Sequence, residues 1–134
     1  MKMKKTLLFF VAVLLFSACQ ESIEKRLARE ARELSEKCPQ TLRIQGADGV
    51  SHIMILDSIV FDIPTLTQRQ YFTMTGDIDN ADFAPTKSIL VEQLKNEPTY
   101  ELHRKNGYSF YYLYRSASHP DSVYAEITIT RQDY

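Results

Sequence analysis

The unbroken apolar run at residues 7–16 is the feature that most limits what this chain can fold into. A helix that crosses a bilayer needs about 20 apolar residues, whereas this run has ten and the polar pair Gln20-Glu21 follows soon after it. Three lysines precede the run. A positive start, a short apolar stretch and small residues before a cut site are typical of a secretory signal peptide. The run therefore predicts a segment that is removed and takes no part in the folded domain.

The residues that follow the run, Phe16-Ser17-Ala18-Cys19, resemble the lipobox of bacterial lipoproteins, with Phe16 where that family usually has Leu, Val or Ile. The resemblance implies cleavage before Cys19, a diacylglycerol on its thiol and acylation of the new amino terminus. Two or three acyl chains anchor a protein stably to a membrane, whereas one does so only marginally. We therefore expect a signal peptide at 1–18 and a single domain at 19–134. A plain signal peptide and an uncleaved membrane anchor remain as alternatives.

The residue after Cys19 bears on which membrane is involved. Gln20 stands where an Asp would favour the inner membrane in enteric bacteria, so the outer membrane is expected, with its periplasmic or outer side left open. Two further segments, "ELSEKCPQTL" and "GYSFYYLYR", resemble small lipoproteins of Bacteroides-type gut bacteria. That resemblance implies a habitat and carries no activity.

The charge of the mature chain argues against one class of partner. Removal of residues 1–18 takes away three of the 16 basic residues and none of the 17 acidic ones, which leaves a net charge of −4. A mildly acidic domain has no electrostatic reason to bind nucleic acid. The expected partners are the membrane, through the anchor on Cys19, and an envelope protein or glycan.

Cys38 is left alone if Cys19 carries lipid. It follows a predicted helix at 21–37 that carries one apolar stripe and ends before Pro39. Three interpretations are open: a small buried residue at the helix end, a thiol that pairs with another chain or with a small thiol, or a nucleophile. The third is disfavoured because a helix C-terminus opposes a thiolate.

The remaining pattern predicts an α+β fold. Alternating apolar residues predict strands within 41–75, then a helix at 85–96 with a further turn or two before Asn106-Gly107, and then strands at 108–116 and 123–131. Short hairpins favour an antiparallel sheet of four to five strands packed by two helices on one face. The arrangement looks loosely like cystatin-type folds, which is an analogy of fold without function.

No motif for catalysis or cofactor binding is present. The loop at 76–84 holds Asp77, Asp79 and Asp82, but its spacing does not fit a calcium-binding EF-hand, and no metal or cofactor is expected. Asp57 interrupts an apolar stretch, which indicates a kink or bulge more than a catalytic acid. We predict a protein that is not an enzyme. The competing hypothesis is an accessory enzyme acting on glycan or peptide, with Asp57, His103 or Glu126 as candidate catalytic residues.

Tyrosines cluster in the C-terminal strands, with five between residues 108 and 124. Aromatic rings stack on sugars and peptides, although they are also good strand formers. We take Tyr111 and Tyr124 as candidate binding residues on an exposed sheet face. The leading hypothesis is a membrane-anchored envelope lipoprotein that acts as a binding module. An inhibitor or immunity-type module is a further alternative.

Overall fold

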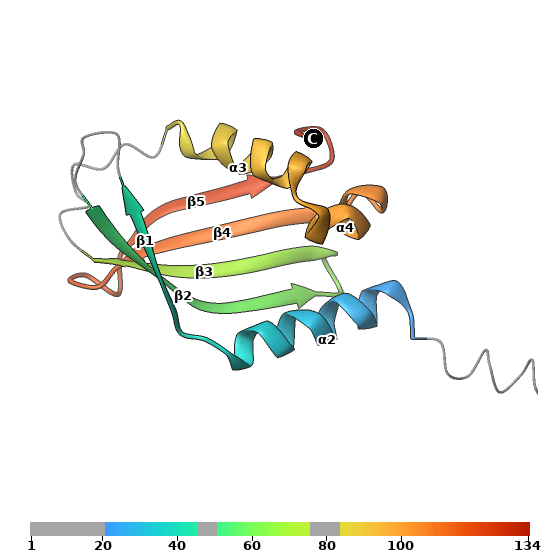
Figure 1. The fold of residues 1–134 in the computed structure, drawn as a ribbon, viewed down its shortest axis with the longest axis horizontal. Coiled ribbons are helices and arrows are strands. Elements are labelled where there is room, and N and C mark those ends of the chain that lie inside the picture. Colours follow the sequence, from blue (N-terminus) through green and yellow to red (C-terminus); the bar gives the residue numbers. More distant parts are fainter. Residues whose placement is uncertain (1–20, 46–50, 76–83) are drawn as a thin grey trace, which may run out of the picture.

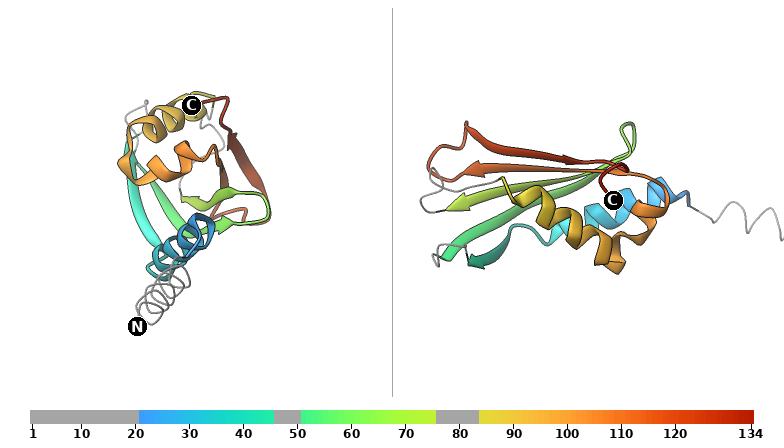
Figure 2. Two further views of the ribbon diagram at one scale, coloured as in Figure 1. Left: turned by 90° about the vertical axis from the view of Figure 1, so that its right-hand side faces the viewer. Right: turned by 90° about the horizontal axis from the view of Figure 1, so that it is seen from above.

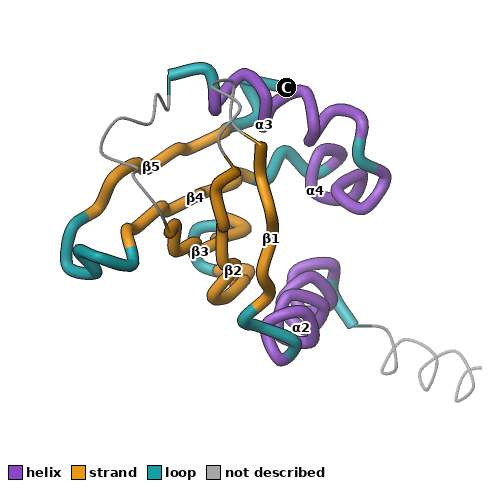
Figure 3. The backbone as a smooth tube through the Cα atoms, turned by 60° about the vertical axis from the view of Figure 1, so that its left-hand side comes forward, coloured by secondary structure: helices purple, strands orange, loops and turns teal. Residues whose placement is uncertain are grey.

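The computed structural model describes residues 21–45, 51–75 and 84–134. In chain order the elements are α2 (Ile23–Glu36), β1 (Gln40–Gln45), β2 (Ser51–Asp62), β3 (Thr67–Thr75), α3 (Thr86–Asn96), the 3₁₀ turn η1 (Pro98–Tyr100), α4 (Glu101–Lys105), β4 (Ser109–Ser116) and β5 (Val123–Ile129). The predicted α+β class is confirmed, and the described α-helices lie on one side of the sheet (Figure 1, Figure 3).

The five strands form one sheet in the order β1-β2-β3-β4-β5. Three of the four neighbouring pairs are antiparallel, but β3 and β4 pair in parallel, with Phe72 opposite Tyr114. The sheet is therefore mixed, which differs in detail from the antiparallel sheet that the sequence predicts. The reason is the long connection through α3, η1 and α4, because a parallel pair needs a crossover whereas a hairpin joins antiparallel strands.

Helix α2 forms where the apolar stripe and Pro39 predict it. The Ser22 side chain accepts a hydrogen bond from the Lys25 backbone N–H at 3.2 Å, which caps the first turn. Leu27 and Ala31 of the stripe are buried, and the helix packs along β2. Ion pairs such as Arg26–Glu30, at 2.9 Å, lie on the exposed face and contribute little to stability.

Asp57 occupies a bulge in β2, as predicted. The pairing with β3 shifts between Leu56 and Ser58, so both Leu56 and Ile59 point to the side of the helices. The Asp57 carboxylate accepts a hydrogen bond from the Thr73 hydroxyl at 2.6 Å. The Ser35 hydroxyl of α2 accepts a hydrogen bond from the Ile59 N–H at 3.4 Å, which ties the helix to the strand just beyond the bulge.

The crossover ends at Gly107, as the Asn106-Gly107 pair predicts. Gly107 has a φ of 70°, and a Cβ there would lie 3.0 Å from the Arg131 side chain. A residue larger than glycine would meet both a strained backbone and a close contact at this position. Gly107 therefore lets the chain leave α4 and enter β4 directly.

The core lies between the sheet and the helices. Its members are buried residues on the helix side of the sheet and on the inner faces of α2 and α3: Leu27, Ala31, Leu56, Ile59, Phe61, Phe72, Met74, Leu94, Tyr108, Phe110, Tyr112, Tyr114, Ile127 and Ile129. The structure describes no helix over the opposite side of the sheet, which we call the uncovered face.

Several predictions fall outside the described residues. These are the signal peptide and Cys19, the turn at residues 46–49, and Asp77, Asp79 and Asp82 of the calcium candidate. Within the part of the chain that is described, no helix has the length and apolar character needed to cross a membrane.

Candidate binding groove

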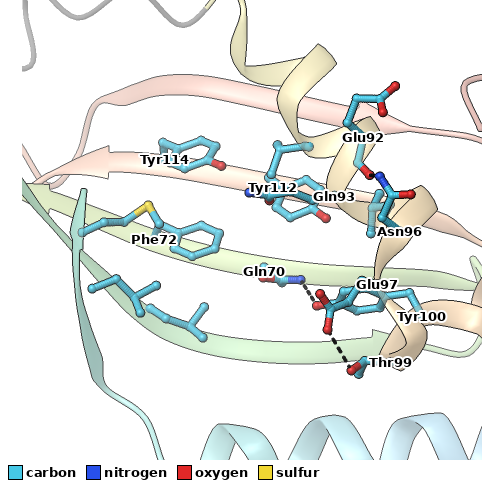
Figure 4. Close-up of a pocket in the computed structure, with 15 residues that line it drawn as sticks. Gln70, Phe72, Glu92, Gln93, Asn96, Glu97, Thr99, Tyr100, Tyr112 and Tyr114 are labelled. Atoms are coloured by element: carbon cyan, nitrogen blue, oxygen red, sulfur yellow. Dashed lines mark hydrogen bonds between the residues drawn. The ribbon is translucent and has the colours of Figure 1, made fainter. Parts of the chain in front are cut away.

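A groove of about 680 Å³ lies on the covered side of the sheet (Figure 4). Strands β1 to β4 supply its floor and α3 with η1 supplies a wall. Residues from every one of these elements line it: Leu42, Met54, Leu56, Gln70, Phe72, Leu90, Glu92, Gln93, Leu94, Asn96, Glu97, Thr99, Tyr100, Tyr112 and Tyr114. A concave, largely apolar site with a few polar groups is the usual form of a binding pocket.

The groove exists because α3 does not cover the middle of the sheet. Figure 1 shows α2 and α3 on either side, with β3 and β4 visible between them. On α3, Leu94 is buried, whereas Leu90 is only half-buried and Ile89 is 55% exposed. Leu90 and Leu94 line the groove whereas Ile89 does not, so part of the apolar side of α3 faces the groove.

Arg104 of α4 holds the groove wall in place. Its guanidinium donates to the Leu94 carbonyl and, at 2.7 Å, to the Glu97 carbonyl. The last carbonyl groups of a helix have no partner within the helix, so a positive donor there satisfies them and complements the helix dipole. This contact fixes the turn between α3 and η1, from which Glu97 and Tyr100 enter the groove.

The floor is aromatic. The Phe72 ring stacks on Tyr114 with ring centroids 5.1 Å apart and planes at 12°, and it lies 6.4 Å from the Tyr112 ring at 16°. Burial raises the pKa of both phenols, that of Tyr114 to about 12. Burial also raises the pKa of Tyr100, whose hydroxyl accepts a hydrogen bond from the Gln70 amide at 3.4 Å. The floor is therefore uncharged at neutral pH and offers a few hydrogen-bonding atoms.

The rim on the α3 side is polar and acidic. Glu92, Gln93, Asn96 and Glu97 are all exposed. Such a rim around an apolar floor suits a ligand with an apolar centre and positively charged flanks, because complementary charge raises association rate and specificity.

The three candidate catalytic residues do not come together. Asp57 lies in the β2 bulge, where it contacts Thr73. Glu126 is exposed on β5, and burial and, after it, the charge of Glu126 raise the pKa of Tyr111 on the uncovered face. His103 is buried on the other side of the sheet. They therefore provide no shared site for acid–base chemistry.

His103 sits among aromatic rings in the core. Its ring centroid lies 5.5 Å from that of Tyr100, 5.4 Å from that of Phe110 and 5.9 Å from that of Phe61. Within the described chain neither ring nitrogen has a hydrogen-bond partner. Burial lowers the pKa of this imidazole to about 4, so it is neutral at physiological pH. Among the residues that the structure describes, no three side chains of the metal-ligating types approach closely enough to hold a metal ion.

Cys38 is half-buried and packs against the core at the end of α2. Its thiol donates to the Leu34 carbonyl at 3.6 Å. Burial and, less strongly, the charge of Asp57 raise the pKa of the thiol. These contacts agree with the interpretation of Cys38 as a small packed residue and oppose the thiolate that a nucleophile requires.

Tyr111 and Tyr124, the candidate binding residues, lie apart. Tyr111 is on the uncovered face, with the Arg69 guanidinium 5.0 Å from its ring centre and the Tyr71 ring 6.4 Å away. Tyr124 packs against the core. The pairing of β4 with β5 shifts between Tyr114 and Arg115. The alternation is therefore inverted around Tyr124, and Val123, which simple alternation with the buried Ile127 and Ile129 would place inside, is 46% exposed.

Sequence reasoning missed the groove. Its floor is built mostly from residues that the alternation assigns to the core and that are buried in the structure, and only the position of α3 leaves a groove above them. One signal was present: Gln68 and Gln70 share the parity of Phe72 and Met74, yet are polar. Both are buried on the covered side. A buried polar residue at a strand position where the alternation predicts an apolar one is informative about a possible site.

The described structure is thus an α+β domain with a groove between a mixed sheet and its covering helices. Residues 22–125 match the family described as "Domain of unknown function (DUF8479)", and the chain belongs to that family. No curated protein matches the chain.

One solved structure with a similar fold is that of the type II secretion system pilotin AspS from Vibrio cholerae. The two chains are 14% identical, the match covers 83% of this chain and 91% of that chain, and the TM-score is 0.50. At this identity the likeness concerns the fold.

Proposed function

We propose that this protein is a lipid-anchored binding module of the outer membrane, and that its groove binds an apolar segment of an envelope protein. The single observation that carries the proposal is the groove itself. It presents an uncharged aromatic floor beneath an acidic rim. Such a surface can bind a peptide segment through apolar anchors.

Three further points support the proposal. The lipobox-like segment ending at Cys19 supplies an anchor. The fold is similar to that of a type II secretion system pilotin. The resemblance of two segments to Bacteroides-type lipoproteins fits the same compartment. The expected ligand segment carries apolar side chains flanked by Lys or Arg, because Glu92 and Glu97 stand at the rim.

Proximity crosslinking in intact cells tests the groove. A photo-reactive amino acid replaces Gln93 on the wall, and a matched variant carries it at Thr128, which is exposed on β5. We expect a defined protein adduct from position 93 and none from position 128, identified by mass spectrometry. The same adduct from both positions, or none from either, would overturn the groove as the binding site.

Fatty-acid labelling tests the anchor separately. The wild-type protein should incorporate labelled fatty acid and sediment with outer membranes, and Cys19→Ser should do neither. Labelling that persists in Cys19→Ser would refute the anchor and leave the groove experiment unaffected.

Tyr111 stays a candidate for a second surface. Its ring is flanked by Arg69 and Tyr71 on the uncovered face, and a flat aromatic surface of this kind suits a sugar ring or a peptide. If Tyr111→Ala changes the set of captured envelope partners while Leu42→Ala does not, the uncovered face replaces the groove as the favoured site.

A further inference from the structure

Three exposed apolar side chains gather where the described chain begins. Ile23 opens α2 and is 39% exposed, while Ile63 and Leu66, in the turn between β2 and β3, are 41% and 39% exposed. The Leu66 N–H donates to the Ile63 carbonyl at 3.2 Å, which closes the turn. We call these three residues the apolar tip.

Contacts place the two parts of the tip at the same end of the molecule. The Tyr108 hydroxyl donates to the Glu24 carboxylate, in the first turn of α2, at 2.7 Å. The next residue, Ser109, donates its N–H to the Leu66 carbonyl at 3.1 Å. The left view of Figure 2 looks directly at this end, where α2 and the β2–β3 turn lie next to each other.

Helix geometry explains why Ile23 is exposed. Ile23 precedes the buried Leu27 by four residues, so it continues the same stripe. Side chains on a helix lean toward its N-terminus, which carries Ile23 beyond the core and toward the turn that holds Ile63. The tip is therefore an extension of the apolar core to the surface.

The backbone at Leu66 gives a second, independent observation. Its φ is 51°, in the left-handed region that glycine and asparagine adopt at least cost. A leucine there costs stability, and because Leu66 is 39% exposed, its burial in this domain offsets that cost only in part. An exposed apolar side chain on a strained turn indicates contact with something outside the domain.

The chain length between the tip and Cys19 identifies that surface. Ile23 is four residues after Cys19, and an extended chain spans at most about 3.6 Å per residue, so the two Cα atoms are within about 14 Å of each other. We propose that the apolar tip inserts into the headgroup region of the bilayer that holds the Cys19 anchor. This inference rests on the proposed lipidation.

Insertion fixes the orientation of the domain. The β4–β5 loop lies at the opposite end from the tip (Figure 1), so it points away from the membrane. The groove then takes a defined angle to the bilayer, in place of the free rotation that a short tether alone would permit.

Depth-dependent quenching tests the insertion. The full lipidated protein, in a Cys38→Ser background, carries an environment-sensitive fluorophore at Thr65→Cys, between Ile63 and Leu66, or at Asp121→Cys in the β4–β5 loop. Vesicles of phosphatidylethanolamine and phosphatidylglycerol contain a shallow spin-labelled lipid. We expect position 65 to be quenched at least about twofold more strongly than position 121, as for a buried interfacial segment. Equal quenching would overturn the proposal.

A substitution that relieves the backbone strain in the turn distinguishes an effect on membrane insertion from an effect on folding. Leu66→Asn removes the apolar side chain at a backbone conformation that asparagine tolerates, so we expect a higher urea midpoint together with weaker quenching at position 65. Val123→Ser, which alters a residue 46% exposed next to the β4–β5 loop, should leave the quenching unchanged. Quenching that survives Leu66→Asn combined with Ile63→Ser would refute the role of the tip.

Vesicle flotation distinguishes failure of the proposed lipid anchor from failure of the proposed insertion. If the wild-type protein does not float with the vesicles, the anchor has failed. If it floats while position 65 is quenched no more than position 121, the anchor stands and the insertion is wrong. A concentration-dependent dimer that shields position 65 would assign the tip to a second copy of this chain and also refute the insertion.

Discussion

The covered side of the sheet has two halves with the same kind of aromatic residue, buried in both, and they differ in that a groove lies above one of them. In the closed half, under α2 and α4, Phe110 is fully buried and Phe61 and Tyr108 are nearly so. In the open half the Phe72 and Tyr114 rings stack in the floor of the groove. In the sequence, the strands of both halves have aromatic residues at alternating positions. The comparison shows that helix placement decides where a groove opens above an aromatic core.

Truncating one side chain in each half should give the largest contrast. Phe110→Ala should lower the free energy of unfolding by about 3–5 kcal/mol, because it leaves a cavity among packed rings. Leu42→Ala, at a groove position 41% exposed, should cost about 1 kcal/mol or less and still weaken the crosslink from position 93. Urea denaturation measures both, and equal costs would mean that the two halves do not differ as described.

The pH dependence of stability should come largely from the closed half. Burial lowers the pKa of His103 to about 4, from 6.5. The unfolded chain therefore binds the proton more readily, and stability falls as the pH decreases through this window. Below pH 4 the loss reaches about 3 kcal/mol. Glu30 opposes the lowering of the pKa and Arg104 adds to it.

His103→Leu is the matched test of that pH dependence. The imidazole nitrogens have no hydrogen-bond partner within the described residues, so replacement by an apolar side chain leaves no partner group unsatisfied. Stability at pH 7 should therefore change by about 1 kcal/mol or less. The decrease between pH 6.5 and 4 should become shallower than in the wild-type protein. An unchanged slope would contradict the assignment of the titration to His103.

A smaller effect is expected where the two halves meet. Arg104→Ala removes the donor to the Leu94 and Glu97 carbonyls and should cost about 2 kcal/mol. It should also loosen the groove wall and reduce the crosslink from Gln93. Arg115→Ala, at an exposed arginine on the uncovered face, is the control and should change stability by about 0.5 kcal/mol or less. Equal effects would show that Arg104 does not support the wall.

Much of the fold was predictable because it depends on local patterns. The stripe from Ile23 to Cys38 predicts α2, and the Asn106-Gly107 pair predicts the end of α4. The charge-interrupted run at Asp57 predicts the bulge in β2. Each signal arises within a few residues, so the sequence carries it directly.

The candidate site was not predictable to the same degree. Tyr124 was assigned outward by simple alternation, and one inserted residue in β5 reversed that assignment. Gln70 and Tyr100 come from distant segments, and only the crossover brings their side chains within 3.4 Å. A contact between distant segments depends on the packing of whole elements, which no local pattern encodes.

The amino-acid sequence by itself determined the α+β class, the element order, the bulge at Asp57 and the acidic charge of residues 19–134. Those properties follow from periodicity, turn chemistry and composition. The tertiary structure decided that β3 and β4 run parallel, that α3 stands away from the middle of the sheet to leave a groove, and that His103 is neutral in an aromatic core. Each of these depends on where a helix comes to rest on the sheet, because burial and contact are properties of packed elements.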